Sequence, residues 1–296
     1  QYKNTFASIF ASNVKQAVFF AKARNYPSSR ASFLDQSNIP EAVYDNLIET
    51  VHKNLDSMYR YVKLRKKMLG VEELHMYDVY APIIHESGKE YTFEEAKKIV
   101  AEGLKPMGEE YLEILKEGFE NRWIDVYENE GKRSGAYSWG SYQSHPYVLL
   151  NYRGTLDNVF TLAHEMGHSI HSYYSKKNQP FAYAGYKIFV AEVASTCNEA
   201  LLIHDLLEKT ENKNERMILI NHFLDKFKGT IYRQTMFAEF EYNMHRKVEK
   251  GEPLTAQEIS RTYHELNKLY FGPDMVSDEA IGLEWTRIPH FYTPFY

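Results

Sequence analysis

Apolar residues recur at three- and four-residue steps over most of this chain, with lysines and arginines between them. This spacing predicts amphipathic helices that turn one face toward a core. Two clear examples are residues 11–25 (ASNVKQAVFFAKARN) and residues 39–69 (IPEAVYDNLIETVHKNLDSMYRYVKLRKKML). We therefore expect a mainly α-helical protein.

Two further helices are predicted by the way they begin. Thr92 is followed three residues later by Glu95, and Thr255 is followed in the same way by Glu258. In such a capping box the threonine hydroxyl accepts from a backbone N–H of the first turn, and the glutamate reaches back to the N–H of the threonine. We expect helices to start after Thr92 and after Thr255.

One segment departs from the helical pattern. Residues 125–152 are rich in glycine, tyrosine and serine, and two aromatic and β-branched runs flank polar turn residues. This pattern is typical of a small β-hairpin or sheet. Because no internal repeat divides the chain, the simplest fold is one mostly helical domain with a minor β element.

Composition narrows the possible partners and location. The 296 residues are 44% hydrophobic, enough for a sizeable core, and their formal net charge is −5. No basic run tracks a phosphate backbone and no apolar run reaches the roughly 20 residues of a membrane span, so neither nucleic acid nor a membrane is expected as a partner. The single cysteine, Cys197, excludes an internal disulfide and favours the cytoplasm. Because the chain starts at Gln1 without a leader, we expect a fragment or a processed product.

The stretch TLAHEMGHSI, residues 161–170, carries the strongest chemical signal. Thr155 can cap a helix over residues 156–175, which places His164 and His168 on it. Residues four apart on a helix lie about 40° from each other around the axis and one turn along it, so the two imidazoles can converge on one cation. Glu165 lies about 100° from His164, which suits a general base acting on a zinc-bound water better than a third ligand.

A catalytic zinc usually has three protein ligands and leaves a fourth position for water. The apolar run IFVAEVASTCNEALLIHDLL, residues 188–207, predicts a buried helix interrupted by carboxylates. Glu192 and Glu199 are seven apart and within about 20° of each other on this helix, so both can face the histidines. We expect Glu192 to be the third ligand and Glu199 to accept a hydrogen bond from an imidazole N–H. Cys197 lies about 140° from Glu192 and is expected to fill the core.

Simpler interpretations stand beside this one. The two histidines can be an accidental match on an ordinary helix, and the two glutamates can lie on a solvated face. His171 lies about 60° away from His168 and is not expected to be a ligand. His245 is expected to be a helical ion-pair partner of Glu241.

The chain also resembles the thimet-oligopeptidase-like zinc metallopeptidases, and among them the oligoendopeptidase F group. The resemblance rests on HEMGHSIHSYYS at 164–175 and EVASTCNEALL at 192–202, with Glu192 24 residues after His168. Supporting blocks stand at 140–165, 231–241, 288–296 and 2–29, so the resemblance covers essentially the whole chain. It implies one helical catalytic domain over 1–296, without the family's N-terminal lobe and C-terminal end.

The resemblance implies the same roles for the zinc ligands, Glu165 and Glu199, and it adds residues that sequence spacing alone does not single out. His290, Tyr292 and Tyr296 are implied as donors to the oxyanion of the reaction. His145 either contacts the substrate or shapes the hairpin turn. Independently of the resemblance, the predicted hairpin can offer an edge strand, and its backbone groups around Trp139 and Gly140 can pair with an extended peptide.

These observations predict a zinc endopeptidase, with one Zn²⁺ per chain, that cleaves internal bonds of short unstructured oligopeptides. Two alternatives remain open. One is a zinc carboxypeptidase or dipeptidase of related helical fold, which needs a basic residue such as Arg233 or Arg287 for the terminal carboxylate. The other is a truncated helical module that binds zinc without turnover. No obligate protein partner is expected.

Overall fold

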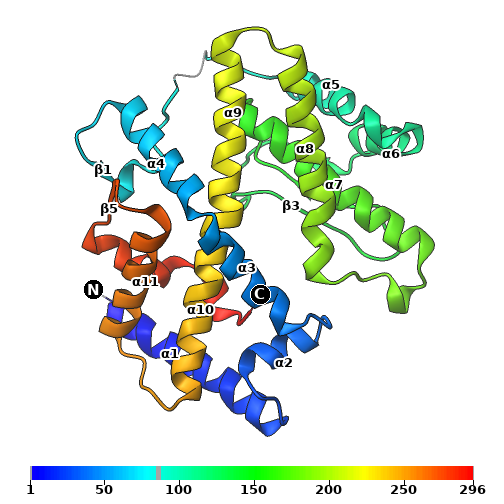
Figure 1. Ribbon diagram of the computed structural model, residues 1–296. Helices are drawn as coiled ribbons and strands as arrows, with labels where there is room; N and C mark the ends of the chain where they lie inside the picture. The colour runs from blue at the N-terminus through cyan, green and yellow to red at the C-terminus, as the bar shows by residue number, and fades with distance from the viewer. Residues whose placement is uncertain (1, 85–87, 296) are drawn as a thin grey trace. The chain divides into compact units, whose positions relative to one another are not determined.

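The computed structural model describes residues 2–84 and 88–295, and the chain divides into two compact units. One unit contains Gln1–His85 and Leu224–Tyr296, and the other contains Glu86–Phe223. The division falls within helix α9, Lys213–Phe227 (Figure 1). Each unit has a hydrophobic core of its own, and one catalytic domain over residues 1–296 stays a prediction.

The first unit is built from helices and one short pair of strands. Strands β1 and β5 pair in parallel, with Leu74 opposite Met275 and His75 opposite Val276. A short π-helix at Lys228–Tyr232 leads directly into α10. Its regular elements are α1 (Lys3–Ala23), α2 (Ser29–Asp35), α3 (Glu41–Lys53), α4 (Leu55–Leu69), β1 (Leu74–His75), α10 (Arg233–Glu249), α11 (Ala256–Phe271), β5 (Met275–Val276) and the 3₁₀ turns at Met76–Asp78, Glu279–Arg287 and Pro289–Tyr292.

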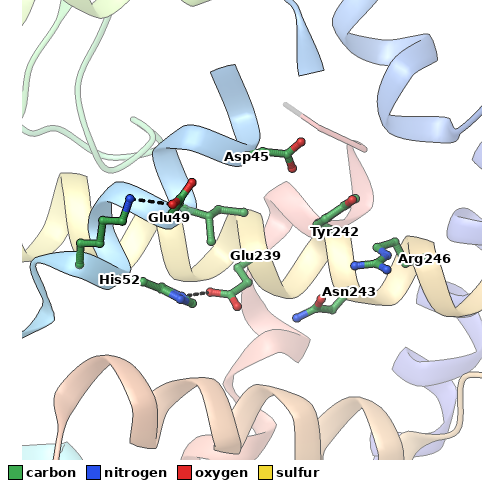
Figure 2. Close-up of a pocket in the computed structure, with 9 residues that line it drawn as sticks. Asp45, Glu49, His52, Glu239, Tyr242, Asn243 and Arg246 are labelled. Carbon is green, nitrogen blue, oxygen red and sulfur yellow. Dashed lines mark hydrogen bonds and ion pairs between the residues drawn. The ribbon is translucent and has the colours of Figure 1, made fainter. Parts of the chain in front are cut away.

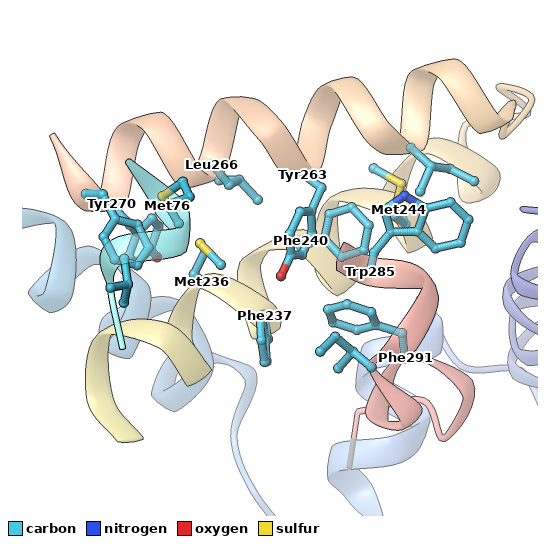
Figure 3. Packing of buried hydrophobic residues seen from close by; sticks show 14 of the residues in the cluster. Met76, Met236, Phe237, Phe240, Met244, Tyr263, Leu266, Tyr270, Trp285 and Phe291 are labelled. Atoms are coloured by element: carbon cyan, nitrogen blue, oxygen red, sulfur yellow. The ribbon is translucent and has the colours of Figure 1, made fainter. Parts of the chain in front are cut away.

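The core of this unit centres on aromatic residues of α10. The Phe240 ring contacts the rings of Tyr263 and Phe291 at centroid distances of 5.0 and 4.8 Å (Figure 3). Phe10 of α1 stacks on Phe240 at 6.0 Å and also contacts Trp285. These rings are fully buried, so they anchor the 3₁₀ turns that follow β5 to α1, α10 and α11.

The second unit combines helices with a three-stranded sheet of order β2-β4-β3. β4 pairs in parallel with β2 and antiparallel with β3, and Ser138 stands opposite Val148 in the antiparallel pair. Its elements are α5 (Phe93–Gly103), α6 (Glu109–Glu120), β2 (Ile124–Asp125), β3 (Tyr137–Trp139), β4 (Tyr147–Leu149), α7 (Leu156–Asn178), α8 (Ala191–Lys209) and the 3₁₀ turns at Lys105–Met107, Phe181–Tyr183 and Ile188–Val190.

Most of the local predictions are confirmed. The fold is mainly α-helical with a small sheet, and the predicted hairpin is the β3–β4 pair. The Thr92 hydroxyl accepts from the Glu95 N–H and the Glu95 carboxylate accepts in return. Thr255 caps α11, whereas the Glu258 side chain pairs with Lys247 and Arg261. The long helix predicted over 39–69 is interrupted at Asn54, where α3 ends and α4 begins.

None of the helices in the described part of the chain combines the length and the apolar character that a membrane span requires.

Candidate metal centre

Helix α7 begins as its sequence predicts. The Thr155 hydroxyl accepts from the Asn158 N–H at 3.2 Å, and the Asn158 side chain completes the capping box. Val159, Phe160 and Ala163 form an apolar stripe along α7, and each is at most 1% exposed. Because this stripe fixes the rotation of the helix, other faces of α7 carry the two histidines.

The imidazoles of His164 and His168 converge. Their rings are 4.8 Å apart between centroids and nearly perpendicular, and their Nε2 atoms are 3.2 Å apart. From α8, the Glu192 Oε2 atom lies 3.3 Å from the His164 Nε2 and 3.5 Å from the His168 Nε2. These residues form the one group of three in the described residues whose metal-ligating atoms lie within 4.8 Å of one another.

The size of this triangle fits zinc. Zinc bonds of about 2.0–2.1 Å to nitrogen and oxygen place the ligand atoms of a tetrahedron about 3.3–3.4 Å apart. The three measured separations, 3.2, 3.3 and 3.5 Å, lie close to that edge length. Two imidazoles and a carboxylate are also a donor set that zinc accepts with a fourth position left open. The residues present therefore suit this metal.

Two neighbouring side chains orient the triangle. Glu199 Oε1 lies 2.5 Å from the Nδ1 of His164, so Nδ1 carries a hydrogen and the opposite ring nitrogen, Nε2, faces Glu192 and His168. The Ser195 hydroxyl donates to Glu192 Oε2 at 2.7 Å and keeps that oxygen on the side of the histidines. Ser195 was not singled out from the sequence. Its position three residues after Glu192 in a helix is the signal that could have identified it.

The charges of the triangle are strongly coupled. Burial lowers the pKa of His164, but hydrogen bonds to Glu192 and Glu199 outweigh burial and raise it to about 9. Hydrogen bonds from His164 and His168 hold the pKa of Glu192 well below its usual range, although burial opposes them. The carboxylate is thus ionised at neutral pH, which is the form that ligates a metal.

Glu165 lies beside the triangle and is 6% exposed. Burial raises the pKa of its carboxyl, while the neighbouring histidines act in the opposite direction. Its Oε2 atom is buried and has no hydrogen-bond partner among the described residues. A buried oxygen of this kind calls for a hydrogen-bond donor such as a water.

The close packing of α7 on α8 brings Glu192 into place. At Gly167, a Cβ atom would stand 2.7 Å from the Ser195 Cα and 2.9 Å from the Ala194 carbonyl oxygen, both of them backbone atoms. Asn198 adds a buried link, since its Nδ2 donates to the Ala163 carbonyl at 2.9 Å and its Oδ1 accepts from the Tyr111 hydroxyl. The helices approach this closely because Gly167 has no side chain.

The exposure of α8 corrects one prediction. The helix was expected to be buried all round, but Val193 is 64% exposed and Cys197 is exposed instead of filling the core. The Glu192 side chain is itself 61% exposed. Only the face with Ala191, Asn198 and Leu202 is buried. The carboxylate direction was predicted correctly from the helical period, whereas the burial was not.

The predicted peptide-binding hairpin lies against α7. The Ser138 hydroxyl of β3 hydrogen-bonds that of Ser169 on α7 at 2.8 Å, one residue beyond His168. β3 is an edge strand of the sheet, and Trp139 at its end is 77% exposed. Gly140 packs so closely that a Cβ would lie 3.1 Å from the His145 carbonyl oxygen. An extended backbone can pair with such an edge.

Three histidines outside the triangle, His145, His171 and His245, have contacts of other kinds. His145 stacks on Trp123 at 5.7 Å and 3° and its Nδ1 bonds the Pro146 carbonyl, so it shapes the turn, and substrate contact stays a prediction. His171 stacks on Tyr186 at 3.8 Å. The ion pair of His245 with Glu241 was wrong: His245 is 1% exposed, bonds Ser29, and burial lowers its pKa to about 3, so it is neutral.

The predicted oxyanion donors belong to the other unit. His290 is exposed and lies in the Pro289–Tyr292 turn. The Tyr292 ring packs on Phe10, and its hydroxyl is buried without a hydrogen-bond partner in the described parts of the chain. Tyr296 lies outside the described residues. The roles of these three residues stay predictions.

A helical fold with two histidines and a glutamate beside a buried carboxyl is the arrangement of an HExxH metallopeptidase. The chain belongs to peptidase family M3, whose family model matches residues 1–296. It is 53% identical to oligopeptidase PepF of Bacillus subtilis over 296 residues, which are 100% of this chain and 44% of that protein. The predicted resemblance is thereby confirmed.

Solved structures of similar proteins support this family assignment. A peptidase structure from Chlamydophila abortus matches with a TM-score of 0.86 and 46% identity, over 100% of this chain and 49% of that one. Oligoendopeptidase F from Enterococcus faecium matches with a TM-score of 0.75 and 42% identity, over 100% of this chain and 46% of that one. The chain thus spans about half the length of the relatives it matches.

Proposed function

We propose that this chain is the zinc-binding catalytic part of a metalloendopeptidase that hydrolyses internal peptide bonds of short oligopeptides in the cytoplasm. The observation that carries the proposal is the His164–His168–Glu192 triangle with the unpartnered Oε2 of Glu165 beside it. The names of the relatives, an oligopeptidase and an oligoendopeptidase, support the substrate class and internal cleavage. The single cysteine supports the location.

The metal would be held by His164, His168 and Glu192, and when bound it supplies Lewis acidity toward a water and the scissile carbonyl. Glu199 keeps His164 in the tautomer that offers Nε2, and Ser195 keeps Glu192 Oε2 turned inward. Glu165 accepts the proton of the attacking water at its carboxylate and passes it to the leaving amine. Its raised pKa, which is caused mainly by burial, suits a group that must both take and give a proton near neutral pH.

Substrate binding is proposed at the β3 edge. The backbone around Trp139 and Gly140 would pair with an extended peptide and so tolerate many side chains. His290, Tyr292 and Tyr296 remain the proposed donors to the oxyanion.

A carboxypeptidase needs a basic residue that binds the terminal carboxylate of its substrate, and neither of the two candidate arginines suits this role. Arg233 and Arg287 both bind the carboxylate of Glu284, which is buried, so their charge is already compensated within the first unit. An internally quenched peptide with both ends blocked separates the two activities. Its cleavage supports the endopeptidase, and cleavage restricted to peptides with a free carboxyl end contradicts it.

The test of catalysis is Glu165→Gln beside Glu113→Gln, an exposed glutamate of α6 in the same unit. We expect Glu165→Gln to keep its zinc and lose at least about 100-fold in kcat, because general acid–base catalysis contributes 10²–10⁴-fold. Glu113→Gln should match the parent. Full activity of zinc-loaded Glu165→Gln would refute the mechanism.

The ligand assignment has its own test. His164→Ala and Glu192→Ala should lose stoichiometric zinc, whereas His204→Ala, an exposed histidine of the same α8, should retain it. Metal analysis after gel filtration gives the ratio of zinc to protein. Stoichiometric zinc in all three variants would contradict the triangle as the binding site.

A further inference from the structure

Residues 288–295, which follow the last long helices of the first unit, are held by several contacts. Phe291 is 1% exposed, and its ring contacts Phe240 at 4.8 Å and Phe237 at 5.4 Å (Figure 3). The Asn13 side chain donates to the Tyr292 carbonyl at 3.2 Å. His290 stands next to the buried Phe291 and is exposed. The orientation of His290 therefore depends on how residues 288–295 are held.

The far end of this segment is held by Glu241 of α10. Glu241 is 7% exposed, and its Oε1 atom accepts from the Phe295 N–H at 2.7 Å. The Phe295 ring lies among the rings of His245, Tyr44 and Phe33, at 4.7, 5.9 and 6.0 Å. Phe295 has a φ of 50°, a left-handed conformation that a residue with a bulky side chain rarely adopts. The hydrogen bond and the ring contacts keep it there.

The surroundings of Glu241 do not supply a cation. The Ser29 hydroxyl donates to Glu249 Oε1 at 2.7 Å, so it must accept from the Nδ1 hydrogen of His245 at 2.8 Å. Burial lowers the pKa of His245 to about 3, so the ring is neutral, and its Nε2 has no partner in the described residues. The nearby Arg30 forms ion pairs with Glu41 and Asp45.

Burial of a carboxyl group without a counter-charge is unfavourable. Burial raises the pKa of Glu241 to about 8, and the hydrogen bond from Phe295 lowers it only in part. An apolar side chain of similar size would avoid this desolvation cost. The interaction that distinguishes a carboxyl from such a side chain here is the bond to the Phe295 amide.

We propose that Glu241 is a positioning residue: by accepting the Phe295 amide it fixes the end of the 288–295 segment and thereby sets the orientation of His290 and Tyr292. The part of this proposal that concerns catalysis rests on the proposed function, in which His290 and Tyr292 donate to the oxyanion. The part that concerns the segment stands on the contacts alone.

The chain offers a matched control on the same helix. Glu239 lines a pocket of about 560 Å³ between α3 and α10, and Figure 2 shows it turned toward His52. Its Oε2 atom binds His52 at 2.7 Å and accepts from the Tyr270 hydroxyl at 2.8 Å. Glu239 is a partly buried glutamate two residues from Glu241, and its partners lie outside the 288–295 segment. Glu239→Gln is therefore a matched control for Glu241→Gln.

The experiment compares Glu241→Gln, which keeps a carbonyl acceptor, with Glu241→Leu, which removes it. Hydrogen exchange of fragments that cover 288–295 should be about 10-fold faster or more in Glu241→Leu than in the parent, and near the parent in Glu241→Gln and Glu239→Gln. Unchanged exchange in Glu241→Leu, or equal acceleration in Glu241→Gln, overturns the proposal.

Peptide hydrolysis adds the catalytic readout. Glu241→Leu should lose about 10-fold or more in kcat, with KM within 2-fold and zinc content unchanged, and Glu241→Gln should restore kcat. A purely structural role would not produce this split between kcat and KM together with rescue by glutamine. An unchanged kcat in Glu241→Leu despite faster exchange refutes the catalytic part. If the parent hydrolyses no peptide, the proposed function fails, and the exchange comparison still decides the role of Glu241.

Discussion

Replacement of Gly167 by alanine should weaken zinc binding without touching a ligand. The new Cβ would stand 2.7 Å from the Ser195 Cα and 2.9 Å from the Ala194 oxygen. Carbon atoms prefer about 3.5–4.0 Å, and a backbone cannot rotate out of the way, so α8 must move by about 1 Å. Glu192 moves with α8. Its oxygen, now 3.3 and 3.5 Å from the two Nε2 atoms, would be drawn beyond the 3.3–3.4 Å edge of a zinc tetrahedron.

The magnitude follows from two opposing terms. Overpacking costs about 1–3 kcal/mol, and alanine in place of glycine in a helix returns about 1 kcal/mol. The metal-free protein should therefore be destabilised by at most about 2 kcal/mol. Its Kd for zinc should rise about 10-fold or more, and a 10-fold rise corresponds to a loss of about 1.4 kcal/mol in binding free energy. Competition with a chromophoric chelator measures the Kd. Gly229→Ala, where the Cβ meets nothing within 4 Å, is the control. Equal zinc affinity in the two variants would refute the reasoning.

Three further predictions concern single side chains. Glu199→Gln should weaken zinc binding about 10- to 100-fold, as chelator competition can show, because His164 loses the carboxylate that orients it. Glu241→Gln should become more stable relative to the parent as pH rises from about 4.5 to about 8, by up to roughly 5 kcal/mol. The reason is that the pKa of Glu241 is raised in the folded protein, so its contribution to stability is present at low pH and is lost as pH rises through 8. A difference in urea unfolding free energy between variant and parent that stays constant across this pH range would contradict the prediction. Thr155→Ala should destabilise the protein by about 1 kcal/mol through the lost cap, and an unchanged urea midpoint would argue against it.

Local patterns predicted much of the candidate site because short-range geometry controls it. A threonine cap and an apolar stripe set the start and the rotation of α7, so the direction of His164 and His168 followed from sequence. The seven-residue spacing placed Glu192 and Glu199 on one face of α8 for the same reason. These statements need only the helical period, which a single sequence displays.

Features that depend on distant segments were not predictable in this way. The parallel pairing of β2 with β4 joins strands of two and three residues, and strands this short carry no alternation that reveals a partner. His245 lies on a regular helix whose spacing suggested an ion pair with Glu241, but it is buried and hydrogen-bonds Ser29 of α2. The helical period states which residues share a face, and it does not state which other element covers that face.

The exposure of α8 shows how this limit bears on the metal centre. An apolar composition suggested that every face of α8 was buried and that Glu192 therefore needed a role inside. In the structure Val193 is 64% exposed, so the premise was wrong, although Glu192 still points at the histidines. What brings Glu192 to them is the close backbone contact at Gly167, the bond from Ser195 and the period of the helix. A carboxylate that is 61% exposed and yet fixed by these three constraints can present one oxygen to a metal while the rest of the side chain remains accessible to solvent.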